Sequence, residues 1–329
     1  MINEMAVGTG APPLDPESAA ALALQMLGDP SPITAADVPH KRAEEEAAAQ
    51  ATLTMLDRRG LVRADHAVTS YDGQEVTVSV VHRKDRIRTS PLIYYIHGGG
   101  MMLGNRWSGA DTFLDWIDRY NAVVATVEYR LAPEHTYPVP QEDCYAGLLW
   151  LEENAGDLGV NVETGLIAGT SAGGGLAASV TLMARDRGGP QVAGQLLLAP
   201  MIDDRNDTPS ARQYPTGLWN AAENELGWRS LLGDLHGCPE VPSHAAPARA
   251  QDLSGLPPAF VEVGSAEVFR DESVAYATRL WQAGGQAELH VWAGGFHGFQ
   301  TLTHTAISRG ALAALHSWMD RALGFTGRV

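Results

Sequence analysis

The feature that most constrains the fold is a regular alternation of short apolar runs with longer helical patterns, which starts near His66 and continues to the end of the chain. Several of the short runs are almost continuously apolar, as is typical of strands covered on both faces. The alternation predicts an open, mostly parallel α/β sheet. The expected strands are Val76–Val81, Leu92–Ile96, Val123–Val127, Leu166–Ala168, Gln195–Leu198, Phe260–Val263 and Glu288–Trp292. The expected helices between them are Asp111–Tyr120, Gln141–Asn154, Ala172–Arg187, Glu272–Ala283 and Ile307–Leu323.

Two segments stand outside this alternation. Residues 1–62 are expected to be helical, with an Ala- and Leu-rich run from Leu14 to Gly28 and a charged run that ends at Gly60. Residues 201–255 show no strand pattern, and a structureless loop of that length is unusual in a compact domain. We therefore expect a helical insertion that packs with the N-terminal helices as a lid, leaving 63–200 and 256–329 as the α/β core. Its candidate anchors are Trp219, Leu226 and Trp228.

Charge and cysteine content exclude several classes of function. Lys plus Arg total 23 and Asp plus Glu total 39, so the net charge is -16, which argues against binding to nucleic acid or an anionic membrane. The two cysteines, Cys144 and Cys238, have no CxxC spacing and indicate neither zinc nor a disulfide framework. The apolar run Ala19–Leu27 is too short to span a bilayer and lacks the flanks of a signal peptide. A soluble, cytoplasmic protein is expected.

The motif that carries chemistry follows the strand Leu166–Ala168. The residues Gly169-Thr-Ser-Ala-Gly173 form G-x-S-x-G between a strand and a helix, a turn that exposes the hydroxyl of Ser171 at the carboxyl end of the sheet. Alone, the pattern also fits an ordinary glycine-rich turn. Gly173–Ala178 also fits the dinucleotide fingerprint G-x-G-x-x-A, but its glycines begin five residues past the strand and no acid follows at the expected place.

A second glycine-rich loop follows the strand Leu92–Ile96. In His97-Gly-Gly-Gly100, three successive glycines allow backbone N–H groups to turn toward a ligand. Gly99 and Gly100, with the N–H of Ala172 after the serine, are candidate oxyanion donors. His97 precedes the serine in the chain and is interpreted as a loop-shaping residue.

A base and an acid follow in the chain order that this chemistry uses. His297 lies between glycines after the last strand, whereas His304 and His316 fall in or near the next helix and are interpreted as structural. Three acids follow the strand Phe260–Val263. Glu267 lies nearest to the strand end, whereas Asp271 and Glu272 fall in the first helical turn, where acids are favoured structurally. Glu267 is therefore preferred, with Asp271 as its competitor.

Together these blocks resemble the bacterial hormone-sensitive-lipase-like esterases, or family IV. The resemblance covers roughly residues 65 to 325. It rests on His97–Gly100, Glu128-Tyr-Arg-Leu-Ala-Pro-Glu134, Gly169–Gly174, Leu256–Pro258 and His297–Phe299. It implies an α/β-hydrolase core with a mostly parallel eight-stranded sheet, helices on both faces, a helical cap and no cofactor or metal. One departure stands out: the family usually has Asp-Pro-Leu-x-Asp near the acid, where this chain has Glu267-Val-Phe-Arg-Asp271.

The resemblance and the residues predict the same chemistry. Ser171 attacks an ester carbonyl, His297 transfers the proton, Glu267 orients His297, and Gly99, Gly100 and Ala172 hold the oxyanion. A capped pocket and the family's preference favour short- to medium-chain acyl esters, with Trp219, Met101 and Met102 as candidate pocket walls. An amidase, deacetylase or lactonase would use the same triad. A non-catalytic plant hormone receptor shares the fold but lacks the histidine. Relatives often form homodimers through the last strand, so a homodimer is a further expectation.

Overall fold

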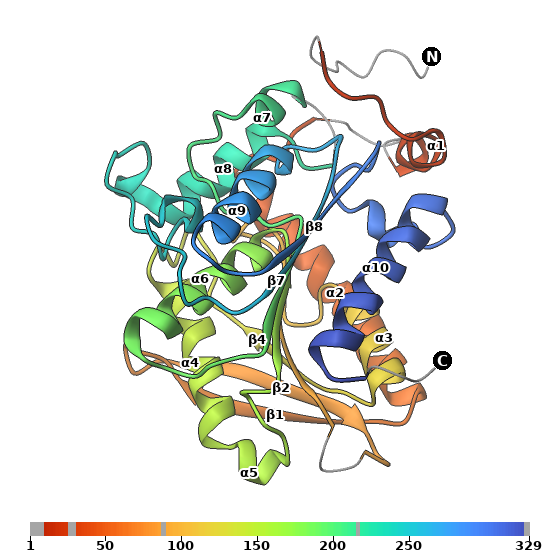
Figure 1. Ribbon diagram of the computed structural model, residues 1–329, viewed down its shortest axis with the longest axis vertical. Helices are drawn as coiled ribbons and strands as arrows, with labels where there is room; N and C mark the ends of the chain where they lie inside the picture. The colour runs from red at the N-terminus through yellow and green to blue at the C-terminus, as the bar shows by residue number, and fades with distance from the viewer. Residues whose placement is uncertain (1–9, 26–30, 87–89, 215–217, 326–329) are drawn as a thin grey trace.

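A single mixed sheet organises the chain, as seen in the computed structural model, which describes residues 10–25, 31–86, 90–214 and 218–325 (Figure 1). Within these residues eight strands pair in the order β1-β2-β4-β3-β5-β6-β7-β8. β2 is antiparallel to β1 and to β4, and every other neighbouring pair is parallel. The strands are β1 Leu61–Thr69, β2 Glu75–Arg83, β3 Leu92–Ile96, β4 Val123–Glu128, β5 Leu166–Thr170, β6 Gly194–Leu198, β7 Ala259–Gly264 and β8 Ala287–Trp292.

Helices cover both faces of this sheet. Figure 1 shows α2, α3 and α10 on one side and α4, α6 and α9 on the other. The helices are α1 Pro16–Gln25, α2 Val38–Arg58, α3 Ala110–Tyr120, α4 Val139–Glu153, α5 Ala155–Leu158, α6 Ala172–Arg187, α7 Pro209–Gln213, α8 Ala221–Leu232, α9 Arg270–Gln282 and α10 Ala306–Ala322, with short 3-10 turns η1 Gly233–Leu235, η2 Pro247–Arg249 and η3 Phe299–Thr301.

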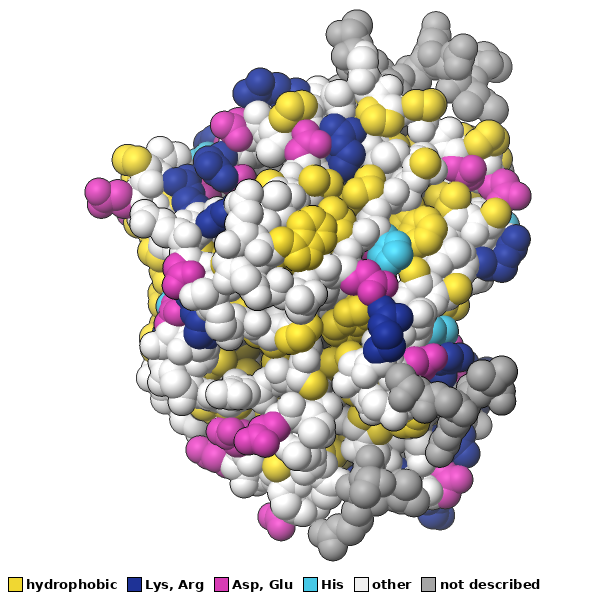
Figure 2. Space-filling model, viewed as in Figure 1, with side chains coloured by type: hydrophobic (Ala, Val, Ile, Leu, Met, Phe, Trp, Pro, Cys, Tyr) yellow, Lys and Arg dark blue, Asp and Glu magenta, His cyan; other side chains and the backbone are white. Residues whose placement is uncertain are grey.

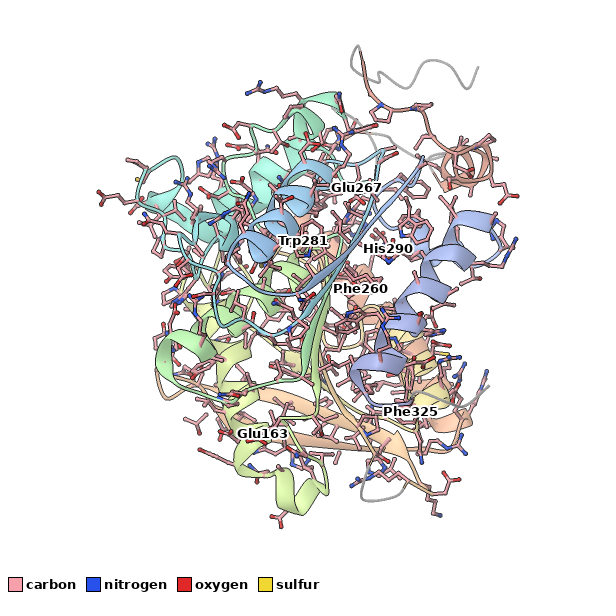
Figure 3. All side chains as sticks on the ribbon, in the orientation of Figure 1. Glu163, Phe260, Glu267, Trp281, His290 and Phe325 are labelled. Atoms are coloured by element: carbon pink, nitrogen blue, oxygen red, sulfur yellow. The ribbon has the colours of Figure 1, made fainter. Side chains whose placement is uncertain are left out.

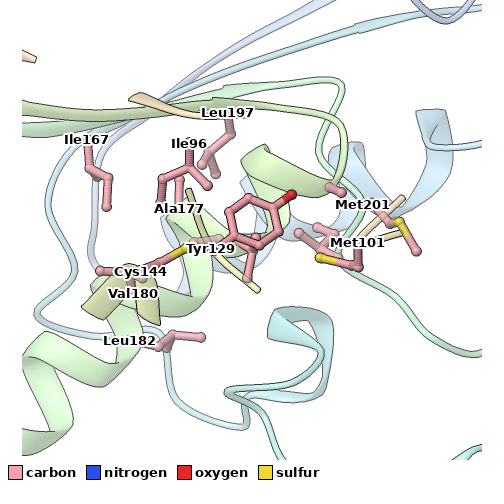
Figure 4. Close-up of a cluster of buried hydrophobic side chains, with 14 of the residues drawn as sticks. Ile96, Met101, Tyr129, Cys144, Ile167, Ala177, Val180, Leu182, Leu197 and Met201 are labelled. Carbon is pink, nitrogen blue, oxygen red and sulfur yellow. The ribbon is translucent and has the colours of Figure 1, made fainter. Parts of the chain in front are cut away.

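The hydrophobic core explains why the central strands are continuously apolar. Every residue of β3, β6 and β7 is buried, because each of these strands packs against helices on both faces. Figure 4 shows part of the larger cluster, in which Ile96 of β3 and Ile167 of β5 meet Val180 of α6 and Cys144 of α4. A second cluster on the opposite face joins the strands to α3 and α10. The fold is therefore the α/β-hydrolase arrangement that the sequence predicted, with the carboxyl ends of the parallel strands at one edge.

The N-terminal segment and the insertion, which are expected to form a cap, lie against each other. In its described parts, 201–214 and 218–255, the insertion forms α7, α8, η1 and η2 and no strand. Its α8 begins with a capping box between Asn220 and Glu223, and Glu223 also accepts a hydrogen bond from the backbone N–H of Ile33 (3.1 Å). The Tyr214 hydroxyl donates to the Pro12 carbonyl (2.9 Å). The insertion and the N-terminal segment thus contact each other directly.

The sequence analysis missed the first strand of the sheet. β1 begins at Leu61, inside the segment 1–62 expected to be helical. Most of its residues are exposed because it lies at the edge of the sheet, so it carries no apolar pattern. Smaller differences are the extra short helix α5 and shifts of one or two residues at helix ends. The predicted end of the first helical run at Gly28 lies outside the described residues.

The structure shows where the charged side chains and the two cysteines lie. On the face shown in Figure 2, Lys and Arg side chains are interspersed with Asp and Glu and form no broad basic surface. Cys144 is buried and Cys238 is half-buried, and both are free thiols. Among the described residues, no helix is both long and apolar enough to cross a membrane, and no cluster of three or more His, Cys, Asp or Glu could hold a metal ion.

Candidate active site

Ser171 lies at the sharp turn between β5 and α6. Its backbone has φ 59° and ψ -123°, a conformation that non-glycine residues rarely adopt and that is typical of strained functional turns. The flanking glycines are required by close packing. A Cβ on Gly169 would lie 2.1 Å from the carbonyl oxygen of Gly173, and a Cβ on Gly173 would lie 2.0 Å from that of Ile96. The glycines therefore let α6 start directly behind the serine.

The same packing excludes the dinucleotide alternative. Gly173, Gly174 and Gly175 all belong to α6 and are buried. A Cβ on Gly175 would lie 2.0 Å from the Met201 carbonyl oxygen, and one on Gly174 would lie 3.0 Å from Pro200. These glycines accommodate neighbouring protein backbone, so they leave no space for a pyrophosphate.

His297 connects the serine to a carboxylate. Its Nε2 lies 3.1 Å from the Ser171 Oγ, and its Nδ1 lies 2.6 Å from the Glu267 Oε2. Because the carboxylate can only accept, Nδ1 is the protonated nitrogen and Nε2 faces the serine as an acceptor. The ring of Phe269 packs edge-on against the imidazole, with centroids 5.1 Å apart. The geometry permits proton transfer between the serine hydroxyl and the imidazole.

The two competing acids occupy different environments. Glu267 is 1% exposed, lies on the loop after β7 (Figure 3) and also accepts a hydrogen bond from the Gly264 N–H (2.6 Å). Asp271 points elsewhere: it accepts from the backbone N–H of Ser210 (2.8 Å) at the start of α7 and from the Arg270 guanidinium (2.8 Å). Burial opposes ionisation of Asp271, but these hydrogen bonds outweigh it and lower its pKa.

Glu272, the third acid of the sequence analysis, has a structural position. Its carboxylate accepts hydrogen bonds from the N–H groups of Ile202 (2.9 Å) and Asp203 (3.3 Å), at the start of the insertion. Complete burial raises its pKa well above the usual range. Only Glu267, of the three, contacts the histidine.

The loop after β3 has an unusual backbone. Gly99, Gly100 and Met101 have φ values of 112°, 61° and 64° in succession. A Cβ on Gly99 would lie 2.2 Å from the Leu103 carbonyl oxygen, so glycine is required there. Gly99 and Gly100 line a pocket of about 260 Å³ together with Ser171 and His297. Ala172 is the first residue of α6, so its N–H has no acceptor within the helix.

His97 is buried beneath this loop. Its Nδ1 donates to the Gly98 carbonyl (2.8 Å), and its ring stacks on Tyr129 with centroids 4.2 Å apart. Burial lowers the pKa of His97 to about 4, so the ring is neutral at physiological pH. This placement agrees with a loop-shaping residue and does not bring His97 to the serine.

The rest of the pocket comes from α2, from β3 and the loop after it, from the end of β5 and from the insertion. Trp219 of the insertion lines it, and a Cβ on Gly100 would lie 2.1 Å from its ring. Met101 and Met102 are both 1% exposed and are not among the described residues that line this pocket, so their role as pocket walls stays a prediction. Glu45 of α2 was missed by the sequence analysis, because nothing local marks a helical residue that reaches a loop 59 positions away. The described residues that line the pocket are Glu45, Tyr95, Gly98, Gly99, Gly100, Gly104, Ser108, Gly109, Thr170, Ser171, Leu218, Trp219 and His297.

Comparison with known proteins identifies the family. The family model described as alpha/beta hydrolase fold matches residues 93–301. The chain belongs to that family. Carboxylesterase NlhH from Mycobacterium tuberculosis is 36% identical, over 69% of this chain and 72% of NlhH. Esterase LipI from the same species is 34% identical over 65% of each chain, so the match spans slightly less than two thirds of LipI.

Solved structures match over nearly the whole chain. A bacterial heroin esterase superposes with a TM-score of 0.87 at 38% identity, covering 94% of this chain and 98% of that one. Esterase LipW from Mycobacterium marinum superposes with a TM-score of 0.84 at 31% identity, covering 96% and 99%. The protein is thus a member of the hormone-sensitive-lipase-like esterases, a group of serine hydrolases, as its motifs suggested.

Proposed function

We propose that this protein is a carboxylesterase that hydrolyses short- to medium-chain acyl esters through Ser171, His297 and Glu267. The observation that carries the proposal is the continuous hydrogen-bonded connection from the Ser171 hydroxyl through His297 to the buried Glu267. The esterases that resemble this chain support the same reaction class.

The reaction proceeds in two stages. The Ser171 Oγ attacks the ester carbonyl carbon while His297 Nε2 takes its proton, and the carbonyl oxygen becomes an oxyanion held by the N–H groups of Gly99, Gly100 and Ala172. Collapse of this intermediate expels the alcohol, which receives the proton from His297. Water then attacks the acyl-enzyme with His297 as base and releases the acid. Glu267 fixes the imidazole tautomer and stabilises the imidazolium.

Pocket size supports the preference for modest acyl chains. A volume of about 260 Å³ is below the usual range for sites that enclose drug-sized ligands. The bulky Trp219 ring packs against the oxyanion loop and restricts the space beside the serine. Leu218 and Trp219 line the pocket, so we expect these two side chains to limit the length of the acyl chain.

Hydrolysis of aryl esters over a series of acyl lengths tests this function. We expect a maximum at short to medium chains, an initial burst of phenol equal to the enzyme concentration where deacylation is slow, and loss of activity in Ser171→Ala by a factor of ~10⁴ or more. Faster turnover of matched amides or lactones would instead assign the amidase, deacetylase or lactonase alternative. Binding of the ester without either a burst or steady-state turnover would indicate a non-catalytic receptor.

Two expectations about context belong to this proposal. A cytoplasmic location and a homodimer through the last strand follow from the sequence analysis. Support for the dimer comes from β8, which ends the sheet and carries the exposed Val291. The exposed Trp281 (labelled in Figure 3) also contacts this strand, because its indole N–H donates to the Ala287 carbonyl (2.9 Å). Sedimentation equilibrium tests the dimer, and fractionation of the native host tests the location. A monomer at micromolar concentration would remove the dimer from the proposal.

A further inference from the structure

One face of α2 contacts the loop that carries the oxyanion glycines. Arg42 donates from Nε to the Met102 carbonyl (2.8 Å) and from a terminal nitrogen to the Ala132 carbonyl (2.7 Å). Glu45 lies three residues after Arg42 and therefore on the same face of the helix. Its carboxylate accepts a hydrogen bond from the Gly104 N–H. The Asn105 side chain donates to the Glu45 carbonyl (3.2 Å). A single turn of α2 thus holds the far end of the loop.

Glu134 holds the Arg42 side chain in place. Both terminal nitrogens of Arg42 donate to the Glu134 carboxylate, each at 2.9 Å, in a bidentate pair. The same segment contacts the loop from its other side, because the Ala132 N–H donates to the Met101 carbonyl (2.9 Å). Arg42 therefore bridges two backbone segments that flank the oxyanion loop.

The loop needs such external contacts because its backbone is strained. Gly99, Gly100 and Met101 have positive φ in succession, and Met101 lacks the freedom that glycine has in this region. Its internal hydrogen bonds run from the N–H groups of Met102 (3.1 Å) and Leu103 (2.8 Å) to the carbonyl of Gly99. The contacts from α2 start at Met102, directly after the strained residues.

We propose that Arg42, supported by Glu45, is a positioning residue for the oxyanion hole. Arg42 holds Met102 and Glu45 holds Gly104, so that the N–H groups of Gly99 and Gly100 stay directed at the substrate carbonyl oxygen. This inference rests on the proposed esterase function. It assigns to the N-terminal helix a role in the chemical step, in addition to covering the pocket. Arg42 itself does not touch the substrate.

The test compares Arg42→Met with Arg59→Met. Arg59, directly after the end of the same helix, makes a half-exposed ion pair with Asp118 of α3 (2.8 Å) rather than with the oxyanion loop, so it is a matched control. Exhaustive labelling with a fluorophosphonate first counts the competent Ser171 sites in each preparation, and rates are expressed per labelled site. A misplacement of about 1 Å at a reacting centre can cost ~10² in rate. We expect kcat to fall ~10- to 100-fold in Arg42→Met with KM within ~3-fold, and no comparable change in Arg59→Met.

A transition-state analogue separates positioning from a general structural role. An aryl trifluoromethyl ketone forms a tetrahedral adduct whose oxygen occupies the oxyanion site. Its inhibition constant should rise by the same factor by which kcat/KM falls. Arg42→Lys, which cannot form the bidentate pair, should show an intermediate loss, and Glu134→Gln a smaller one. These two variants carry the test if Arg42→Met fails to fold.

Three outcomes are distinguishable. An unchanged kcat per labelled site, or equal losses in Arg42→Met and Arg59→Met, would overturn the positioning role. A rise in KM that accounts for the whole loss would also overturn it, because it would show weakened substrate binding instead. If the wild-type protein neither hydrolyses esters nor labels at Ser171, the proposed function itself has failed.

Discussion

The catalytic edge of the sheet and the cap are held together in different ways. Around Ser171, backbone lies against backbone: a Cβ on Gly173 or on Gly264 would come within about 2 Å of a neighbouring carbonyl oxygen. The insertion and the N-terminal segment meet each other instead through separate polar contacts between distant parts of the chain, such as Tyr214 to Pro12 and Glu223 to Ile33. We therefore expect the core to fix the chemistry at Ser171 and the insertion to set which esters reach it.

The largest expected effect is on the triad acid. Glu267→Gln keeps the shape and the hydrogen bond from Gly264, but its amide would donate to His297 Nδ1 and favour the wrong tautomer. A comparable change in a well-studied triad costs ~10⁴ in turnover. We expect kcat on an aryl acetate to fall by ~10² to 10⁴ with little change in the unfolding midpoint. A nearly normal rate would mean that the carboxylate has been assigned incorrectly.

The buried His97 should make the free energy of unfolding depend on pH. Burial lowers its pKa to about 4 in the folded protein, against an ordinary value of 6.5. Between these pH values the unfolded chain binds more protons, so the free energy of unfolding falls as the pH drops from 6.5 toward 4. At ~1.4 kcal/mol per pKa unit, the loss approaches ~3 kcal/mol.

His97→Asn checks this pH dependence. The variant retains a donor for the Gly98 carbonyl but does not titrate in this range. Urea unfolding between pH 7 and pH 4.5 should therefore show a shallower loss of stability than in the wild type. Identical pH dependence in the two proteins would show that the burial of His97 does not set it.

A substitution in the insertion should change the preference of the enzyme for acyl length. Trp219→Phe removes the part of the indole that packs on Gly100 and should enlarge the pocket. Because one methylene is worth ~1–3 kcal/mol in a fitted site, the kcat/KM ratio of hexanoyl to acetyl ester should rise about 10-fold. Trp228→Phe is the control, since Trp228 is buried in α8 and does not line the pocket. Equal shifts in both variants would argue against a specific role for Trp219.

Removing the first thirty residues is a less specific test of the cap. α1 packs against the loop that carries His297: Leu22 is buried in a cluster with Phe296 and Phe299. The N–H of Asp15 also donates to the Gly294 carbonyl (3.0 Å). Truncation would therefore disturb the catalytic histidine as well as acyl preference.

The smallest effect is expected at Asp271. Asp271→Asn weakens the hydrogen bond to the Ser210 N–H and the ion pair with Arg270, and should cost ~1 kcal/mol of stability. The kcat of the variant should stay within a few-fold of the wild type, measured beside Glu267→Gln. A nearly inactive Asp271 variant would reverse the assignment of the two acids.

Much of the catalytic edge could be predicted because its requirements are local. Gly169 and Gly173 mark a turn that only glycine permits, and continuously apolar strands such as Leu92–Ile96 indicate burial on both faces. Glu267 was preferred over Asp271 because it lies closer in sequence to the end of the strand Phe260–Val263. In the structure Glu267 lies beside His297.

The missed features depend on contacts between distant residues. Arg42 and Glu45 meet the oxyanion loop about sixty positions later, and nothing in the helical pattern of α2 marks them. Leu22 reaches the His297 loop at the other end of the chain. β1 escaped detection because an exposed edge strand needs no apolar face. Local sequence patterns thus predict which helices and strands form and where the chain turns. They do not predict the contacts between distant elements that hold the N-terminal segment in place.

The most direct test of the central claim is to locate the covalent adduct. The protein is incubated with excess fluorophosphonate, digested and mapped by mass spectrometry, with Ser171→Ala treated in parallel. We predict one adduct per chain, on the peptide that contains Ser171, loss of esterase activity in proportion to labelling, and no adduct in Ser171→Ala. An adduct on another residue, or full esterase activity in Ser171→Ala, would contradict it.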